Sequence, residues 1–567
     1  MLKGIGASPG IAIGKIFLIE QEELKIECKA INDNHIEKEI KRLKSALVKS
    51  REQIQEIREK ASTEQRNILE AHIMILEDPE LVKTVETKIQ SEKINSEAAL
   101  QTTLEMFVAI FEAMEDEYMK ERAADIRDVG QRLLMNLLGK EQLNLKNLKE
   151  PVILVARDIT PSDTAQMDPE KVMGFLTDIG GRTSHSAIMA RSMEIPAVVG
   201  LGRITEKIKT GDFVILDGET GQVYINPEEK LVDLYNEAKE KELAVKRGLR
   251  ALINRETISK DGKKVELGCN IGNPNDAEKA HENGAEGIGL YRTEFLYMDR
   301  SDLPSEEEQF SAYKKVLEIM GDRPVVIRTL DVGGDKELPY LQLPREMNPF
   351  LGYRAIRICL DQKEIFKTQL RALLRASTYG NLKIMYPMIS SVEEVRSANT
   401  VLEEVKEELE RENIAYSKDI EVGIMIEIPA AAIISDLLAK EVDFFSIGTN
   451  DLIQYTTAVD RMNEKISHLY NPFNPAVLRL IQQVIVNGHR AGIWVGMCGE
   501  VAGDKRLIPI LLGMGLDEFS MSAGNLLPAR RQIHGLIYEE MKNISEKVLE
   551  MSTAEEIQQF LTEATSQ

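Results

Sequence analysis

The chain has 567 residues and a formal net charge of −22, from 71 basic and 93 acidic residues. This length predicts about three or four domains. The acidic balance argues against general nucleic-acid binding and permits a basic protein partner. Four widely spaced cysteines without a CxxC pair predict neither a disulfide framework nor a zinc site, and no apolar run reaches the ~18 residues of a membrane span. We therefore expect a chain that stays in the reducing cytoplasm without membrane insertion.

The first 145 residues change character near residue 21. Residues 2–20 have the apolar alternation of short strands, which are too few to form a domain and must pair elsewhere. Residues 21–145 are charged and poor in glycine, with apolar residues at helical spacing between about Asp33 and Leu138. We predict four or so helices there, an all-α subdomain interrupted near Pro79.

Residues 146–227 return to an α/β pattern, and we expect them to share one domain with residues 1–20. The helical segment is then an insertion in this domain. The predicted strands are 152–155, 172–176, 197–199, 213–216 and 223–225.

His185 is the candidate reactive residue of that α/β domain. It follows an apolar strand and the pair Gly180–Gly181, and it precedes a segment with helical spacing. A glycine turn entering a helix offers free backbone N–H groups and a positive dipole end to an anion, so a phosphoryl group on His185 would be stabilised. The alternative is a histidine that only caps the helix. His72 is a second candidate, but its helical context favours packing.

The remaining chain predicts a linker helix followed by a barrel. Residues 228–259 are rich in helix-forming and charged residues, which favours a solvated helix that could serve as a hinge. Strands and helices alternate over residues 260–567, the pattern of a (β/α)8 TIM-type barrel. The predicted fold is thus a multidomain α/β protein.

Polar residues follow several predicted barrel strands, where chemistry collects in such barrels. They are Asn270, Arg292, Arg328, Asp331, Glu427, Asn450, Asp451 and Cys498. The carboxylates Glu427 and Asp451 suit Mg²⁺ or Mn²⁺ better than Zn²⁺. Together with Arg461, the arginines suit a small molecule with both a carboxylate and a phosphate. A lone cysteine is more often an inert buried thiol, so these observations alone do not assign a catalytic role to Cys498.

Three stretches carry a resemblance to a known family. Gly180–Arg191 with Ile195–Gly200, then Gly289–Tyr297 with Asn348–Arg354, and finally Asp443–Tyr455 are similar to signatures of the phosphoenolpyruvate-utilising enzymes. The order of the parts resembles the enzyme I family of the bacterial sugar phosphotransferase system. A histidine domain with a helical insert comes first, a barrel comes last, and we identify no nucleotide-binding domain.

The resemblance implies a role for each candidate residue. His185 is the phosphorylated nucleophile, Arg292 and Arg328 bind the phosphate of phosphoenolpyruvate, and Arg461 and Asn450 bind its carboxylate side. Glu427 and Asp451 hold Mg²⁺, and Cys498 is the proton donor. The resemblance also implies the phosphocarrier protein HPr as the partner of the helical insert, pyruvate as the product and a homodimer formed by the barrel.

Three alternative functions stay open. A dikinase would share the histidine and barrel motifs but needs an ATP-binding domain, for which the assigned segments leave no room. A regulatory paralogue would signal through His185 without serving sugar uptake. A metal-dependent lyase would use the barrel alone. We also expect the histidine domain to move between two docking positions, since a barrel mouth that shields the reaction cannot admit a protein acceptor.

Overall fold

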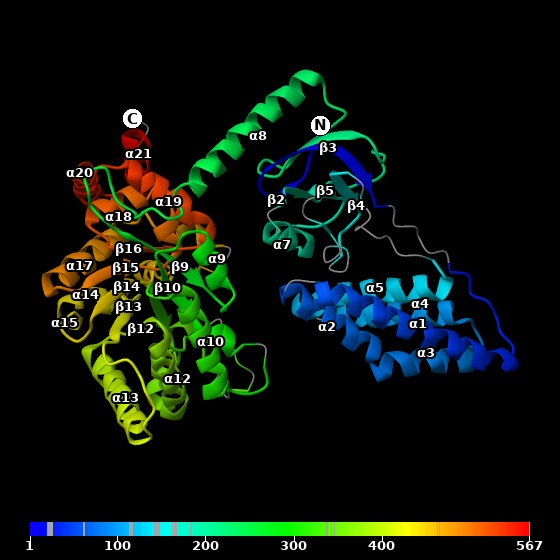
Figure 1. Cartoon of the computed structure of the whole chain (residues 1–567), viewed down its shortest axis with the longest axis horizontal. Helices are drawn as coiled ribbons and strands as arrows, with labels where there is room; N and C mark the ends of the chain where they lie inside the picture. Colours follow the sequence, from blue (N-terminus) through cyan, green and yellow to red (C-terminus); the bar gives the residue numbers. More distant parts are fainter. Residues whose placement is uncertain are drawn as a thin grey trace. The chain divides into compact units, whose positions relative to one another are not determined.

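The structure is a computed structural model, and it divides into two compact units, residues 1–244 and 245–567. Figure 1 labels most of their helices and strands. The described residues are 1–19, 26–60, 63–112, 117–140, 148, 150–160, 163, 167–168, 171–181, 184–193, 195–298, 300–334, 338, 340–341, 343–344, 346–461, 463 and 465–565.

An eight-stranded sheet organises the α/β part of the first unit, in the order β1-β8-β7-β3-β4-β5-β6-β2. β3 lies between two strands from far along the chain, parallel to β4 and antiparallel to β7. The N-terminal strands therefore join the later sheet, as predicted. The bounds are β1 Leu2–Lys3, β2 Ile5–Ser8, β3 Ile11–Leu18, β4 Val152–Ala156, β5 Val172–Thr177, β6 Ala197–Val199, β7 Phe213–Asp217 and β8 Gln222–Ile225.

Successive side chains of the central strands enter two different apolar clusters. Leu154 of β4 belongs to one cluster, whereas its neighbours Ile153 and Val155 belong to the other. This follows from the two-residue period of a strand, and it explains why the central strands are apolar throughout. One of these clusters contains Ala187 and Ala190 of helix α7 (His185–Ser192).

A separate core holds together the helices inserted between β3 and β4. The described part of this insertion contains five helices, where the sequence predicted four or so. Asp78 begins α3 because its carboxylate accepts a hydrogen bond from the backbone N–H of Glu80 at 2.7 Å, and Pro79 fits the first helical position. The bounds are α1 Asp33–Lys60, α2 Thr63–Glu77, α3 Pro79–Glu92, α4 Ser96–Glu112 and α5 Glu117–Leu138.

The borders predicted for the helical insert, residues 21 and 145, lie outside the described residues. The predicted linker helix is present as α8 (Glu229–Arg250), and the division between the two units falls inside it.

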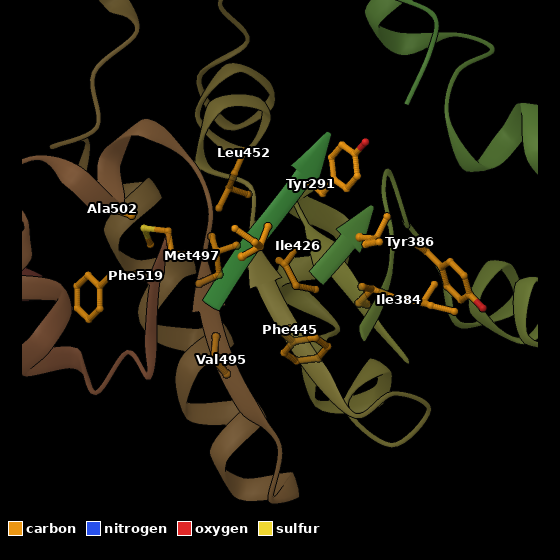
Figure 2. Close-up of a cluster of buried hydrophobic side chains, with 14 of the residues drawn as sticks. Tyr291, Ile384, Tyr386, Ile426, Phe445, Leu452, Val495, Met497, Ala502 and Phe519 are labelled. Carbon is orange, nitrogen blue, oxygen red and sulfur yellow. The ribbon is translucent and has the colours of Figure 1, made fainter. Parts of the chain in front are cut away.

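The second unit contains a closed barrel of eight parallel strands, β9 to β16, which confirms the predicted barrel. Side chains pointing outward from the strands, such as Phe445, Val495 and Phe519, pack beneath the surrounding helices (Figure 2). The strand bounds are β9 Glu266–Ile271, β10 Gly287–Arg292, β11 Pro324–Arg328, β12 Asn381–Tyr386, β13 Glu421–Ile426, β14 Phe444–Ile447, β15 Trp494–Met497 and β16 Glu518–Met521.

Helices and short 3₁₀ turns follow the barrel strands, and the last three helices of the chain lie after the final strand, β16. The helices are α9 Asp276–Glu282, α10 Glu306–Met320, α11 Ile356–Asp361, α12 Lys363–Ala376, α13 Val392–Arg411, α14 Pro429–Ile433, α15 Ser435–Leu438, α16 Thr449–Thr457, α17 Pro475–Ala491, α18 Ile508–Met514, α19 Ala523–Gly535, α20 Tyr538–Glu550 and α21 Ala554–Thr565. The 3₁₀ turns are η2 Thr293–Leu296, η3 Pro349–Leu351, η4 Ser377–Tyr379, η5 Ser467–Leu469 and η6 Glu500–Gly503.

Candidate functional site

A cavity of about 530 Å³ lies where the barrel strands end, and polar residues dominate its wall. All seven barrel residues proposed from the sequence for catalysis, substrate or metal line this cavity: Arg292, Arg328, Glu427, Asn450, Asp451, Arg461 and Cys498. They come together because parallel strands deliver their carboxyl ends to one face of the barrel. Asn270 is the exception among the strand-end residues, since its side chain binds the backbone carbonyls of Cys498 and Ser520 instead.

Two buried arginines share one aspartate in the cavity wall. Arg328 Nη1 and Arg354 Nη2 each lie 2.9 Å from a different oxygen of Asp331. Arg328 also binds Glu294 at 2.7 Å, and Arg354 reaches Asp451 at 3.2 Å. Burial alone would lower the pKa of Arg328, but the charges of Asp331 and Glu294 outweigh it and raise that pKa. The guanidiniums are therefore charged and held in fixed positions, as bidentate recognition of phosphate requires.

Glu427 and Asp451 form a pair of carboxylates whose oxygens are not all used by hydrogen bonds and could bind a cation. Burial raises the pKa of Glu427 to about 8, and the neighbouring charges of Asp451 and Asp331 add to this effect. The Glu427 carboxylate accepts a hydrogen bond from the backbone N–H of Met388 at 2.6 Å, while Asp451 Oδ1 is buried without a hydrogen-bond partner. An unsatisfied carboxylate oxygen beside a second carboxylate costs free energy that a divalent cation would remove.

The chemistry of this pair fits Mg²⁺ or Mn²⁺. Both ions prefer oxygen ligands, and Mg²⁺ is commonly held by one or two carboxylates while water and substrate phosphate complete its shell. In the described part of the chain, no group of three or more His, Cys, Asp or Glu side chains could hold a metal by itself. The pair would supply two oxygen ligands, and water and substrate phosphate would supply the others.

Cys498 lies at the end of β15 among the apolar residues that fill the barrel interior. Burial raises the pKa of its thiol to about 12. The thiol therefore keeps its proton at neutral pH, as a proton donor must, but the same protonation state holds for an inert buried thiol. Its position in the cavity wall distinguishes it from Cys269 and Cys359, which are buried and do not line the cavity.

His185 is the first residue of α7, in the first unit. Ser184 is the N-cap of this helix, and its side chain accepts a hydrogen bond from the backbone N–H of Ala187 at 3.3 Å. Gly180 has a φ of +118°, a backbone conformation that glycine adopts most readily. The strand, glycine turn and helix start predicted around His185 are therefore present. Arg182 and Thr183, which lie between the glycine pair and Ser184 and could add phosphate donors, lie outside the described residues.

His72 has the packing role that the sequence favoured. Its side chain is fully buried in the helical bundle, and Nε2 lies 3.2 Å from Asp125 Oδ1.

Sequence reasoning missed several cavity residues, above all Arg354. This arginine follows no strand, so the rule that chemistry collects at strand ends could not select it. Its one available signal was its position at the end of the Asn348–Arg354 motif, which we used only for family resemblance. Glu294, Tyr470 and Glu500 also line the cavity from connecting segments.

Comparison with known proteins identifies the family of the chain. Three family models of the phosphoenolpyruvate-utilising enzymes match it: the N-terminal domain at residues 3–122, the mobile domain at residues 148–221 and the PEP-binding domain at residues 246–537.

Similar curated relatives are all called phosphoenolpyruvate-protein phosphotransferase. The protein from Bacillus subtilis (strain 168) is 58% identical, with 99% of this chain and 99% of that protein covered. The protein from Geobacillus stearothermophilus is 57% identical, with 99% and 97% covered. The protein from Staphylococcus carnosus (strain TM300) is 53% identical, with 100% and 99% covered. Among the described helices, none is both long and apolar enough to span a membrane.

Proposed function

The chain belongs to the phosphoenolpyruvate-protein phosphotransferases, within the phosphoenolpyruvate-utilising enzymes, and on that premise we propose that His185 is the residue that carries the phosphoryl group. The enzyme takes this group from phosphoenolpyruvate and passes it to a protein acceptor, in the phosphotransferase system of sugar uptake. The observation that carries the proposal is the gathering of charged arginines, a carboxylate pair and a protonated thiol in one cavity.

Within that cavity, Arg292 and Arg328 bind the phosphate of phosphoenolpyruvate, while Arg461 and Asn450 bind its carboxylate side. The charge of Arg328, fixed by Asp331 and Glu294, supports its role. Arg354 would join the phosphate site, because its guanidinium lies between Asp331 and Asp451. These fixed donors neutralise the equatorial oxygens of the phosphoryl group, which is the main requirement of phosphoryl transfer.

Glu427 and Asp451 would hold Mg²⁺, with Mn²⁺ as a substitute. The bound ion would supply charge neutralisation and orientation for the substrate. The unpartnered Asp451 Oδ1 and the raised pKa of Glu427 support this assignment, since both reflect carboxylates gathered without enough positive charge.

The proposed reaction balances as follows. An imidazole nitrogen of His185 attacks phosphorus, the new N–P bond forms, and the P–O bond to the enolate oxygen breaks in line with it. The enolate of pyruvate then takes a proton at carbon from Cys498, which leaves a thiolate that must be reprotonated from solvent. Protonation at carbon traps the leaving group, so the phosphoryl group does not return to it.

The acceptor we propose is the histidine of HPr, docked by the helical insert, and the barrel would form the homodimer. We place the enzyme in the cytoplasm, which agrees with four cysteines that are all free thiols. The histidine domain would move between barrel and acceptor, and the segment 228–259, which contains α8, would act as the hinge.

One labelling experiment separates this proposal from its rivals. The purified chain is incubated with Mg²⁺ and phosphoenolpyruvate labelled in its phosphate, with no ATP. We expect one acid-labile phosphate per chain, on the peptide containing His185, and we expect it to disappear in His185→Ala. His35→Gln, at an exposed histidine of α1, is the control and should label normally.

Two results would contradict the proposal. Label on another residue would refute the assignment of His185. Continued turnover of phosphoenolpyruvate by His185→Ala would favour a lyase that uses the barrel alone. Transfer to added HPr separates an uptake enzyme from a regulatory paralogue, because only the former must deliver phosphate at the rate of sugar import.

A further inference from the structure

We propose that Gln369 is a positioning residue that sets the relative position of the two arginines that bind phosphate. The inference rests on the roles proposed above for Arg292 and Arg328. Gln369 lies on α12, outside the barrel strands, and its side chain is completely buried. It does not line the cavity, so any effect on the substrate must pass through its neighbours.

The side-chain amide of Gln369 forms hydrogen bonds with two loops at the same time, the one after β10 and the one after β11. Its Oε1 accepts a hydrogen bond from the backbone N–H of Leu330 at 2.9 Å, in the loop after β11. Its Nε2 donates to Thr293 Oγ1 at 3.2 Å, in the loop after β10. The same nitrogen reaches the hydroxyl of Tyr313 on α10 at 3.2 Å, so both of its protons have partners.

Two of these contacts, those to Thr293 and Leu330, adjoin residues of the phosphate site. Thr293 directly follows Arg292, and its hydroxyl donates to the backbone carbonyl of Arg328 at 2.8 Å. Leu330 lies between Arg328 and Asp331, the carboxylate that both buried arginines share. The hydrogen bonds of Gln369, directly to Leu330 and through Thr293 to the carbonyl of Arg328, therefore fix the backbone that leaves Arg328.

This arrangement matters because phosphate recognition is sensitive to geometry. A displacement of about 1 Å at a reacting centre can cost on the order of a hundredfold in rate. Replacing the amide of Gln369 by an apolar group would leave the buried N–H of Leu330 without a partner, and the loop would shift to satisfy it. The shift would move Arg328 and Asp331, which lie at and just after the end of β11. It would not move Asn450 or Arg461, which come after β14.

Gln309 on α10 offers a matched control. It is also a buried glutamine, and its Oε1 accepts hydrogen bonds from the hydroxyls of Tyr297 and Tyr313 at 3.0 and 3.1 Å. Its Nε2 donates to the carbonyl of Pro304 at 3.1 Å. It therefore makes as many buried hydrogen bonds as Gln369. The two glutamines share Tyr313, but no partner of Gln309 adjoins Arg292 or Arg328.

The experiment measures ligand affinity in the full-length chain with Mg²⁺, in a His185→Ala background that prevents turnover. Phosphoenolpyruvate and pyruvate are titrated by calorimetry into Gln369→Met and Gln309→Met. We expect Gln369→Met to weaken the binding of phosphoenolpyruvate at least about tenfold. The binding of pyruvate should weaken less than about twofold, since pyruvate has no phosphate. Gln309→Met should lose comparable thermal stability and leave both affinities within about twofold.

A second pair of variants tests the same link without touching Gln369. Thr293→Val removes the hydroxyl and should also weaken phosphoenolpyruvate selectively, while Thr293→Ser keeps the hydroxyl and should restore most of the affinity. The inference is overturned if Gln369→Met leaves phosphoenolpyruvate binding unchanged, if both ligands weaken in step, or if Gln309→Met has the same selective effect.

Arg328→Lys separates the failure of this inference from the failure of the proposed function. If Arg328→Lys binds phosphoenolpyruvate normally, the proposed phosphate site is wrong and the role of Gln369 falls with it. If Arg328→Lys loses affinity and Gln369→Met does not, only the role of Gln369 is wrong.

Discussion

Glu518 at the start of β16 should contribute to the pH dependence of the stability of the barrel, and its replacement by glutamine should remove that contribution. The carboxyl group lies inside the barrel at the amino ends of the strands, where glycines leave room for it. A Cβ atom on Gly289 would lie 1.9 Å from Glu518 Oε1, and one on Gly268 would lie 2.1 Å from it. Oε1 has no hydrogen-bond partner. Burial raises the pKa of Glu518 to about 8, and the charge of Glu266 adds to it.

The sign and size follow from proton linkage. The pKa of the folded state is above the ordinary 4.5, so the folded chain holds a proton that the unfolded chain releases between pH 4.5 and about 8. The stabilising contribution of the protonated carboxyl is complete below pH 4.5 and is lost as pH rises through 8. At about 1.4 kcal/mol for each pH unit, the loss is at most roughly 5 kcal/mol.

Calorimetric melting of the full-length chain at several pH values measures this effect. The side chain in Glu518→Gln stays neutral at every pH. The free energy of unfolding of this variant, relative to that of the parent, should therefore grow from pH 5 to pH 8 and level off above that. The control is Glu441→Gln, because the hydrogen bond from Arg396 lowers the pKa of this surface carboxyl and its charge is constant over the range. An advantage of Glu518→Gln that is constant, or that shrinks as pH rises, would refute the reasoning.

Three further predictions concern the thiol, the barrel core and the dimer. Cys498→Ala should lower kcat at saturating Mg²⁺ and phosphoenolpyruvate while substrate affinity changes little; an unchanged kcat would make the thiol an inert core residue. Gly289→Ala should lower the free energy of unfolding by about 1–3 kcal/mol through its clash with Glu518, whereas Gly524→Ala, with open space around it, should cost nothing measurable by chemical denaturation. A fragment from about residue 255 onward should sediment as a dimer, and a monomeric barrel with a dimeric N-terminal half would reverse that assignment.

The fold was predictable from the sequence because each unit has its own periodicity. Alternating strands and helices in the second half indicated a barrel, and the loss of glycine with helical spacing before Leu138 indicated an all-α insertion. It was also predictable that the N-terminal strands join the later sheet, where β3 pairs with β4 and β7, since an isolated pair of short strands has no core of its own. The number of helices in the insertion was less certain, because long charged helices give few breaks in sequence.

The cavity residues were predictable only where topology fixes their position. Arg292, Arg328 and Glu427 follow strands, and a closed parallel barrel must bring such residues to one face. Arg354 escaped because it lies in a long connection, and its place in the wall depends on ion pairs with Asp331 and Asp451. Pairs between residues so far apart in the chain leave no periodic signal.

The two ends of the barrel show why a perturbed carboxyl does not by itself identify a site. Burial raises the pKa of both Glu427 and Glu518 to about 8. Glu427 lies at the carboxyl end of its strand, beside two buried arginines and a cavity of about 530 Å³ that can admit a substrate. Glu518 lies at the amino end, against glycine backbone, in a space of about 10 Å³ that holds no more than one water molecule. At the proposed cation site a bound ion would displace the proton of Glu427, whereas at the other end the same shift only makes stability fall as pH rises. Access to the cavity decides between the two.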